Sequence, residues 1–120
     1  MAIRERRKGP RFNIHHPVFY FRNYQRREGR SLDVSLDGIK IETDAEVLPN
    51  ETLDITLAIG ESLVKVKGKV VYVEQLPQGR YHVGIAFRDL SPVAQEALTE
   101  CFSDIMAHGS ERPGILKKIE

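Results

Sequence analysis

SLVKVKGKVVYVE, residues 62–74, is the stretch that decides the fold class. One parity of this stretch is apolar and the other carries lysines. The apolar positions are Val64, Val66, Val70 and Tyr72. Because successive side chains of a strand point to opposite faces, the pattern predicts a long strand with valines in the core and lysines in solvent. Gly68 falls on the apolar parity, where we expect a bulge or a bend of a barrel.

Shorter strand-like runs lie on both sides of this stretch. We expect further strands at residues 18–21, 30–34, 38–43, 53–57 and 81–87, each bounded by turn residues. The period changes at Ser91 and Pro92, which are typical of a helix start, and apolar residues then recur at helical steps to Met106. The sequence therefore predicts a mainly β protein, a small antiparallel barrel of six to seven strands with a C-terminal α-helix.

The chain of 120 residues has the length of a single domain. We divide it into a flexible basic arm at 1–16, a barrel with its helix at 17–108, and a frayed tail at 109–120. Residues 1–30 carry nine Lys or Arg against two Asp or Glu, although the net charge of the whole chain is only +1. A basic arm on an acidic body can attract a polyanion, but a solvated tail that only aids solubility explains the charge equally well.

Several function classes lack their signatures. No apolar run approaches the length of a membrane span, and no leader-like segment opens the chain, so we expect a cytoplasmic protein without a membrane span. The single cysteine, Cys101, fits a reducing compartment. The four histidines lack metal-ligand spacing, no glycine-rich phosphate loop is present, and Ser35 has no evident histidine base. We expect no enzyme, no metal and no cofactor.

The first motif with candidate chemistry is RKGPR, residues 7–11, in the basic arm. Arg7 and Arg11 lie four residues apart, and the Gly-Pro pair between them favours a turn. A planar guanidinium donates two parallel hydrogen bonds, which suits phosphate oxygens and the acceptor edge of guanine. A disordered basic arm is the plain alternative for this motif alone.

The second motif is DVSLDG, residues 33–38, between two expected strands. Asp33 and Ser35 offer a carboxylate and a hydroxyl, which suit the donor edge of guanine. Gly38 permits a tight turn or a close backbone approach. An ordinary β-turn is the plain alternative here, and only the distance from the first motif favours a ligand site.

In order and spacing, the two motifs resemble the RxxxR and DxSxxG motifs of the PilZ family, bacterial receptors for cyclic di-GMP. The resemblance extends over roughly residues 6–105. It implies a PilZ barrel whose ligand, cyclic di-GMP, contacts Arg7 and Arg11 through guanine and phosphate, and contacts Asp33, Ser35 and Gly38 on the barrel.

The resemblance bears on two further positions. Arg6 precedes the first motif arginine, where PilZ proteins that bind a stacked pair of cyclic di-GMP molecules carry an arginine, so two nucleotides per chain are implied. Tyr72 falls where many PilZ domains have a tryptophan that stacks on a base. It is a secondary candidate, because its parity with Val70 supports a core role equally well. A second RxxxR at residues 26–30 has the wrong separation, and we interpret Arg26 and Arg27 as solvated turn residues.

We therefore expect a cyclic di-GMP receptor whose ligand orders the basic arm and whose altered surface is bound by an unidentified downstream protein. We expect a monomer, with an oligomer through the helix left open. One alternative is a PilZ-type protein–protein adaptor that uses no nucleotide. Another is a nucleic-acid-binding barrel that uses the arm with Phe19, Tyr20 and Phe21, but consecutive aromatic residues make a poor stacking platform and no specific nucleic acid is expected.

Overall fold

A computed structural model describes residues 11–59 and 62–108 of the chain. It contains six strands and one α-helix in that part of the chain: β1 (Pro17–Arg22), β2 (Gln25–Val34), β3 (Gly38–Thr43), β4 (Thr52–Ile59), β5 (Ser62–Leu76), β6 (Arg80–Arg88) and α1 (Pro92–His108). A single 3₁₀ turn, Pro77–Gly79, joins β5 to β6. The predicted mainly β fold with one C-terminal helix is confirmed.

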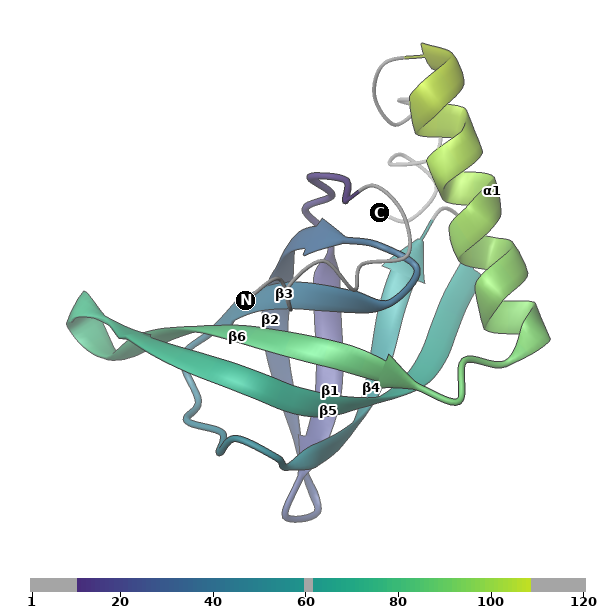
Figure 1. Ribbon diagram of the computed structural model, residues 1–120. Helices are drawn as coiled ribbons and strands as arrows, with labels where there is room; N and C mark the ends of the chain where they lie inside the picture. Colours follow the sequence, from purple (N-terminus) through teal and green to yellow (C-terminus); the bar gives the residue numbers. More distant parts are fainter. Residues whose placement is uncertain (1–10, 60–61, 109–120) are drawn as a thin grey trace, which may run out of the picture.

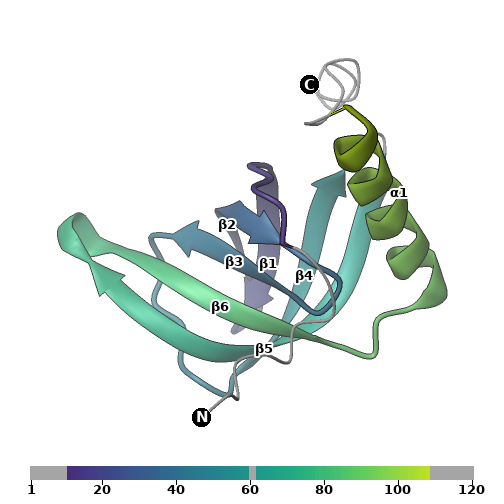
Figure 2. The same cartoon turned by 45° about the horizontal axis from the view of Figure 1, so that its top comes forward.

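The strands form a closed barrel in the order β1-β2-β3-β6-β5-β4, and every neighbouring pair is antiparallel. Figures 1 and 2 show α1 standing beside β4 and β5 at one end of this barrel. The stretch that predicted the fold is β5, the longest strand at 15 residues. Its length lets it pair with β4 through one half and with β6 through the other.

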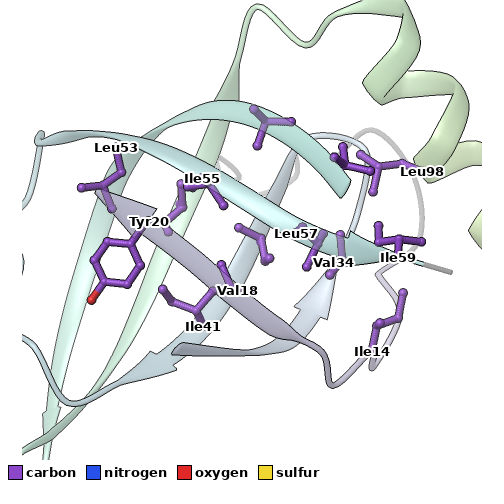
Figure 3. Close-up of a cluster of buried hydrophobic side chains, with 14 of the residues drawn as sticks. Ile14, Val18, Tyr20, Val34, Ile41, Leu53, Ile55, Leu57, Ile59 and Leu98 are labelled. Carbon is purple, nitrogen blue, oxygen red and sulfur yellow. The ribbon is translucent and has the colours of Figure 1, made fainter. Parts of the chain in front are cut away.

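Alternating inward side chains fill the barrel (Figure 3). Val18 and Tyr20 of β1 point inward, and the Tyr20 hydroxyl lies 2.8 Å from Oγ1 of Thr43. Burial raises the pKa of the Tyr20 phenol, although the hydrogen bond with Thr43 partly offsets this effect. Each fully buried Val, Leu or Ile side chain contributes roughly 1.5–3 kcal/mol, so the barrel interior is the main source of stability.

The β1–β2 hairpin is tighter than expected. Asn23 and Tyr24 form a two-residue loop in which both have positive φ, 54° and 63°. This conformation matches the twist of a hairpin, and Asn tolerates it, so β2 begins at Gln25 rather than at Arg30. The interpretation of Arg26 and Arg27 as turn residues was therefore wrong, because both are exposed residues of β2.

β5 departs from strict alternation in its second half. The register with β6 shifts between Val70 and Tyr72, which marks a β-bulge. Val70 is fully buried, whereas Tyr72 is 43% exposed, so the shared parity of these two residues did not place Tyr72 in the core. Gly68 is not the bulge. A Cβ there would lie 2.3 Å from Cγ2 of Ile85, so the crowded barrel interior requires glycine.

The helix begins as predicted. The Ser91 hydroxyl accepts the N–H of Ala94 at 3.1 Å, and Pro92 occupies the first helical position. Leu98 and Phe102 are buried against the barrel, but Met106 is 72% exposed, so the buried stripe ends before it. Within residues 11–59 and 62–108, no helix is long and apolar enough to cross a membrane.

Candidate functional site

The last residues of the expected basic arm are attached to the barrel. The Phe12 N–H donates to the Val34 carbonyl at 2.8 Å, and the Val34 N–H donates to the Phe12 carbonyl at 2.9 Å. Ile14 and His16 are 0% and 2% exposed. Residues 11–16 thus continue the pairing along β2 as a docked segment, although a flexible arm was expected to reach residue 16. Residues 1–10 lie outside the described residues.

Ser31 fastens this segment. Its hydroxyl accepts the backbone N–H of His16 at 2.9 Å and donates to the carbonyl of Ile14. All of these groups are buried, so both hydrogen bonds are shielded from water. These hydrogen bonds hold the docked segment beside β2, with Arg11 at its start.

The DxSxxG motif forms the turn between β2 and β3. The Ser35 N–H donates to the Gly38 carbonyl at 2.9 Å, and the Ser35 hydroxyl donates to the Asp37 carboxylate. A Cβ at Gly38 would lie 2.4 Å from the carbonyl oxygen of Ile85, so glycine lets β3 approach β6. The turn therefore holds Ser35 rigidly, and the direct reason for Gly38 is packing.

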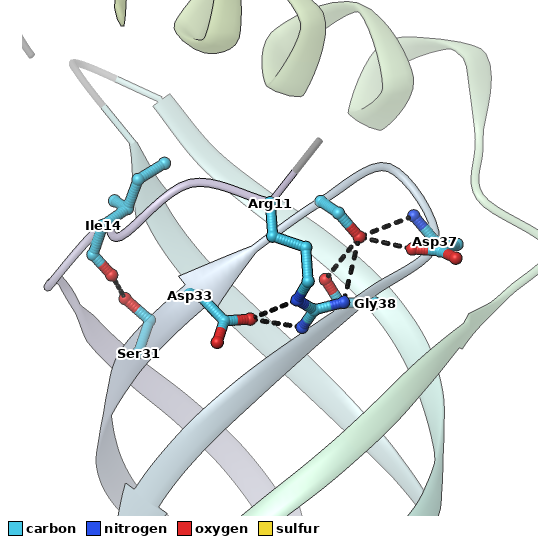
Figure 4. Close-up of polar contacts among 7 residues, drawn as sticks. Arg11, Ile14, Ser31, Asp33, Asp37 and Gly38 are labelled. Carbon is cyan, nitrogen blue, oxygen red and sulfur yellow. Dashed lines mark hydrogen bonds and ion pairs between the residues drawn. The ribbon is translucent and has the colours of Figure 1, made fainter. Parts of the chain in front are cut away.

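Arg11 joins the two motifs. Its Nε donates to Oδ1 of Asp33 at 2.6 Å, its Nη2 forms an ion pair with the same oxygen, and its Nη1 lies 3.4 Å from Oγ of Ser35 (Figure 4). The side chains of Arg11 and Asp33 are 25% and 22% exposed. We call the group of Arg11, Asp33 and Ser35 the Arg11 ledge. It brings Arg11 together with two residues that lie 22 and 24 positions further along the sequence.

Asp33 also begins a row of paired residues that face the outside of the barrel. Asp33 pairs with Lys40 of β3, Lys40 pairs with Gly84 of β6, and Gly84 pairs with Tyr72 of β5. A Cβ at Gly84 would lie 2.2 Å from Cε2 of Tyr72, so the tyrosine ring lies over this glycine. We call these four residues the outward row. It places Tyr72 on the same wall as the Arg11 ledge.

Sequence reasoning missed Lys40 as a member of this wall. Alternation with Ile39 and Ile41 indicated only that Lys40 faces outward. Its position beside Asp33 depends on the β2–β3 register, which shifts between Ser31 and Asp33. Arg6 and Arg7, the other predicted ligand residues, lie outside the described residues.

The second RxxxR leads to a different part of the surface. Arg30 lines an open polar groove of about 330 Å³ together with Glu28, Glu42, Asp44 and Arg80. The hydrogen bond from Arg80 Nε to Glu42, 2.5 Å long, lowers the pKa of that carboxyl below its usual value. Arg80 and Glu42 of this groove are thus paired with each other. Among the residues described, no cluster of three or more His, Cys, Asp or Glu side chains is arranged to hold a metal ion.

A closed antiparallel barrel with a C-terminal helix and a polar ledge on its outer wall defines a small β-barrel domain. The chain belongs to the PilZ domain family, whose sequence model matches residues 5–104. No match was found among curated protein sequences.

Solved structures of three other proteins have the same fold. The PilZ domain of YcgR from Escherichia coli, solved with cyclic di-GMP, has a TM-score of 0.69 and 15% identity, and the alignment covers 88% of this chain and 95% of that one. The MrkH–cyclic di-GMP complex from K. pneumonia has a TM-score of 0.72 and 17% identity, with 88% and 53% covered. The inhibitor of motility MotI from Bacillus subtilis has a TM-score of 0.73 and 14% identity, with 87% and 53% covered. The chain therefore spans about half the length of MotI and MrkH.

Proposed function

We propose that this protein is a receptor for cyclic di-GMP and that the nucleotide binds on the outer wall of the barrel at the Arg11 ledge. The observation that carries the proposal is the contact of Arg11 with both Asp33 and Ser35, because it unites the RxxxR and DxSxxG motifs in one place. Membership of the PilZ family and the cyclic di-GMP complexes of YcgR and MrkH support the same ligand.

The ledge suits a guanine nucleotide chemically. A guanidinium has five N–H donors, and the contacts with Asp33 and Ser35 engage three of its nitrogens in one fixed orientation. The outer N–H groups of Nη1 and Nη2 are left to donate to guanine O6 and N7 or to a phosphate. Asp33 thus acts first as a positioning residue for Arg11, and Ser35 supports the same geometry.

The residues before Arg11 complete the proposed site. Arg7 supplies a second guanidinium to the ligand, and Arg6 supplies charge for a second, stacked nucleotide, as the family resemblance implies. Bound phosphates offset the repulsion among these arginines and order the segment that carries them over the barrel wall. We accordingly propose two nucleotides per chain and retain the segment before the barrel as a ligand-ordered arm.

The residue that follows Arg11 connects the proposed ligand site to α1. Phe12 follows Arg11 directly, and its ring stacks on Phe102 of α1 with centroids 4.6 Å apart. Ligand contact with Arg11 therefore acts on a segment that is packed against the helix. We propose that a partner protein binds the surface formed by the ordered arm and α1.

A nucleic-acid-binding function has weaker support. Phe19 and Phe21 do face outward, while Tyr20 points into the barrel. However, the Arg26 guanidinium lies 4.1 Å from the centroid of the Phe19 ring and covers one of the few faces on which a base could stack.

Isothermal titration of cyclic di-GMP into the full chain and into Arg7→Ala tests the proposal. Arg27→Ala is the matched control, because Arg27 is an exposed arginine on β2 whose side chain donates a hydrogen bond to Gln25 at 3.0 Å. We expect two nucleotides per chain for the native protein and for the control, and a large loss of affinity for Arg7→Ala. A stoichiometry of one nucleotide per chain contradicts the stacked pair but still supports the proposed receptor function. Absence of binding to the native chain refutes the proposed function.

A further inference from the structure

We infer that Lys40 is an additional phosphate-binding residue of this site and favours a dinucleotide over a single nucleotide. The inference deepens the proposed function and rests on it. Lys40 lies outside both motifs, and its assignment comes from its place in the outward row.

The backbone directs Lys40 to the ligand wall. Its neighbours Ile39 and Ile41 are each 1% exposed and point into the core, so the Lys40 side chain leaves the opposite face of β3. On one side it pairs with Asp33 of the Arg11 ledge. On the other side it pairs with Gly84, over which the ring of Tyr72 lies. Lys40 therefore lies between the ledge and the ring of Tyr72.

The local charge leaves Lys40 available to an anion. Asp33 is the nearest carboxylate in the pairing scheme, but Arg11 engages its Oδ1 through both Nε and Nη2. None of the ion pairs found among the described residues involves Lys40. Because Arg11 and Asp33 nearly cancel, Lys40 gives this wall a local positive charge that a phosphodiester can neutralise.

The row also has the span of a ligand larger than a mononucleotide. Two strand spacings separate Asp33 from Gly84, about 10 Å in total at the usual distance between neighbouring strands. The Arg11 ledge binds a guanine at one end of this span, and the ring of Tyr72 offers a stacking surface at the other end. Lys40 stands between the two ends, where a cyclic dinucleotide carries its phosphates. A single nucleotide reaches only one end.

The test compares Lys40→Met with Lys65→Met, titrating each with cyclic di-GMP and with GMP. Lys65 is an exposed lysine of β5 in the register position opposite Thr56, so it is a matched control on another wall. We expect Lys40→Met to weaken cyclic di-GMP binding about tenfold, as loss of a charge-assisted hydrogen bond does, and to change GMP binding much less. Lys65→Met should match the native chain, and Lys40→Arg should retain most of the affinity.

Failure of this inference can be told apart from failure of the proposed function. If the native chain binds cyclic di-GMP and Lys40→Met binds it equally well, Lys40 has no role and only the inference falls. If Lys40→Met weakens GMP and cyclic di-GMP by the same factor, the preference for a dinucleotide is wrong. If the native chain binds neither ligand, both proposals fall. Thermal unfolding of each variant shows whether a lost affinity comes from a lost fold.

Discussion

Asp33 holds the guanidinium of Arg11 through a single carboxylate oxygen, Oδ1, which lies 2.6 Å from Nε. The pair links the segment before β1 to the end of β2, and both side chains are largely shielded from solvent. A charge-assisted contact of this kind fixes the plane of the guanidinium before any ligand arrives. The proposed site is therefore partly preorganised, which reduces the entropy lost when a nucleotide binds.

Replacing Arg11 with lysine tests the importance of the planar guanidinium with its several N–H donors. Lysine keeps the charge but cannot contact Asp33 and Ser35 while also presenting two further parallel donors. We expect Arg11→Lys to fold normally and to bind cyclic di-GMP at least about tenfold more weakly, as loss of a bidentate contact predicts. Equilibrium titration with a fluorescent cyclic di-GMP measures this, with Arg27→Lys as the control. Equal affinity in Arg11→Lys and Arg27→Lys contradicts this role of the Arg11 guanidinium.

The ring of Tyr72 and the missing side chain of Gly84 form a second testable pair. Gly84→Ala places a methyl group where the ring now lies, since the Cβ would be 2.2 Å from Cε2. The ring must move, so we expect Gly84→Ala and Tyr72→Ala both to weaken cyclic di-GMP binding several-fold through lost stacking. Tyr72→Phe keeps the ring and should bind as the native chain does. A loss of affinity in Tyr72→Phe as large as that in Tyr72→Ala contradicts stacking.

Removing the hydroxyl of Ser31 should loosen the docked segment. Ser31→Ala leaves the His16 N–H and the Ile14 carbonyl without their buried partner. We expect the free energy of unfolding to fall by about 1–3 kcal/mol, the usual cost of an unsatisfied buried group. Urea denaturation measures the change. Ser103→Ala, at an exposed position of α1, should change it by less than about 0.5 kcal/mol. A similar value for both variants would show that the segment is not fastened in this way.

The Tyr20 phenol should make stability depend on alkaline pH. Burial raises its pKa above the ordinary value of 10.0, so the unfolded chain ionises first as the pH rises. The contribution of the neutral phenol is complete below pH 10.0 and is lost as the pH passes the raised folded pKa. Unfolding titrations between neutral and alkaline pH should show this loss in the native chain and a weaker loss in Tyr20→Phe. An identical pH dependence in both contradicts the assignment.

Much of the barrel could be predicted from local pattern, because the valine and lysine alternation in β5 and the Ser91-Pro92 helix start depend only on neighbouring residues. Two features could not. The Asn23-Tyr24 turn lacks the glycine that usually marks a two-residue hairpin, and the bulge before Tyr72 reverses a parity without any local signal.

The candidate site was less accessible to sequence reasoning. The two motifs indicated which residue types belong together, but the contact of Arg11 with Asp33 depends on the backbone bridge between Phe12 and Val34. Lys40 joins the wall only through cross-strand register. Both are tertiary relationships, which strand periodicity does not specify.

A double-mutant cycle on Arg11 and Asp33 tests the central claim most directly. Cyclic di-GMP affinity is measured by calorimetry for the native chain, Arg11→Ala, Asp33→Ala and the double variant. If Asp33 acts by positioning Arg11 at the nucleotide, each single variant loses affinity and the double variant binds no more weakly than Arg11→Ala alone. Additive losses, or an Arg11→Ala variant that binds as tightly as the native chain, contradict the account.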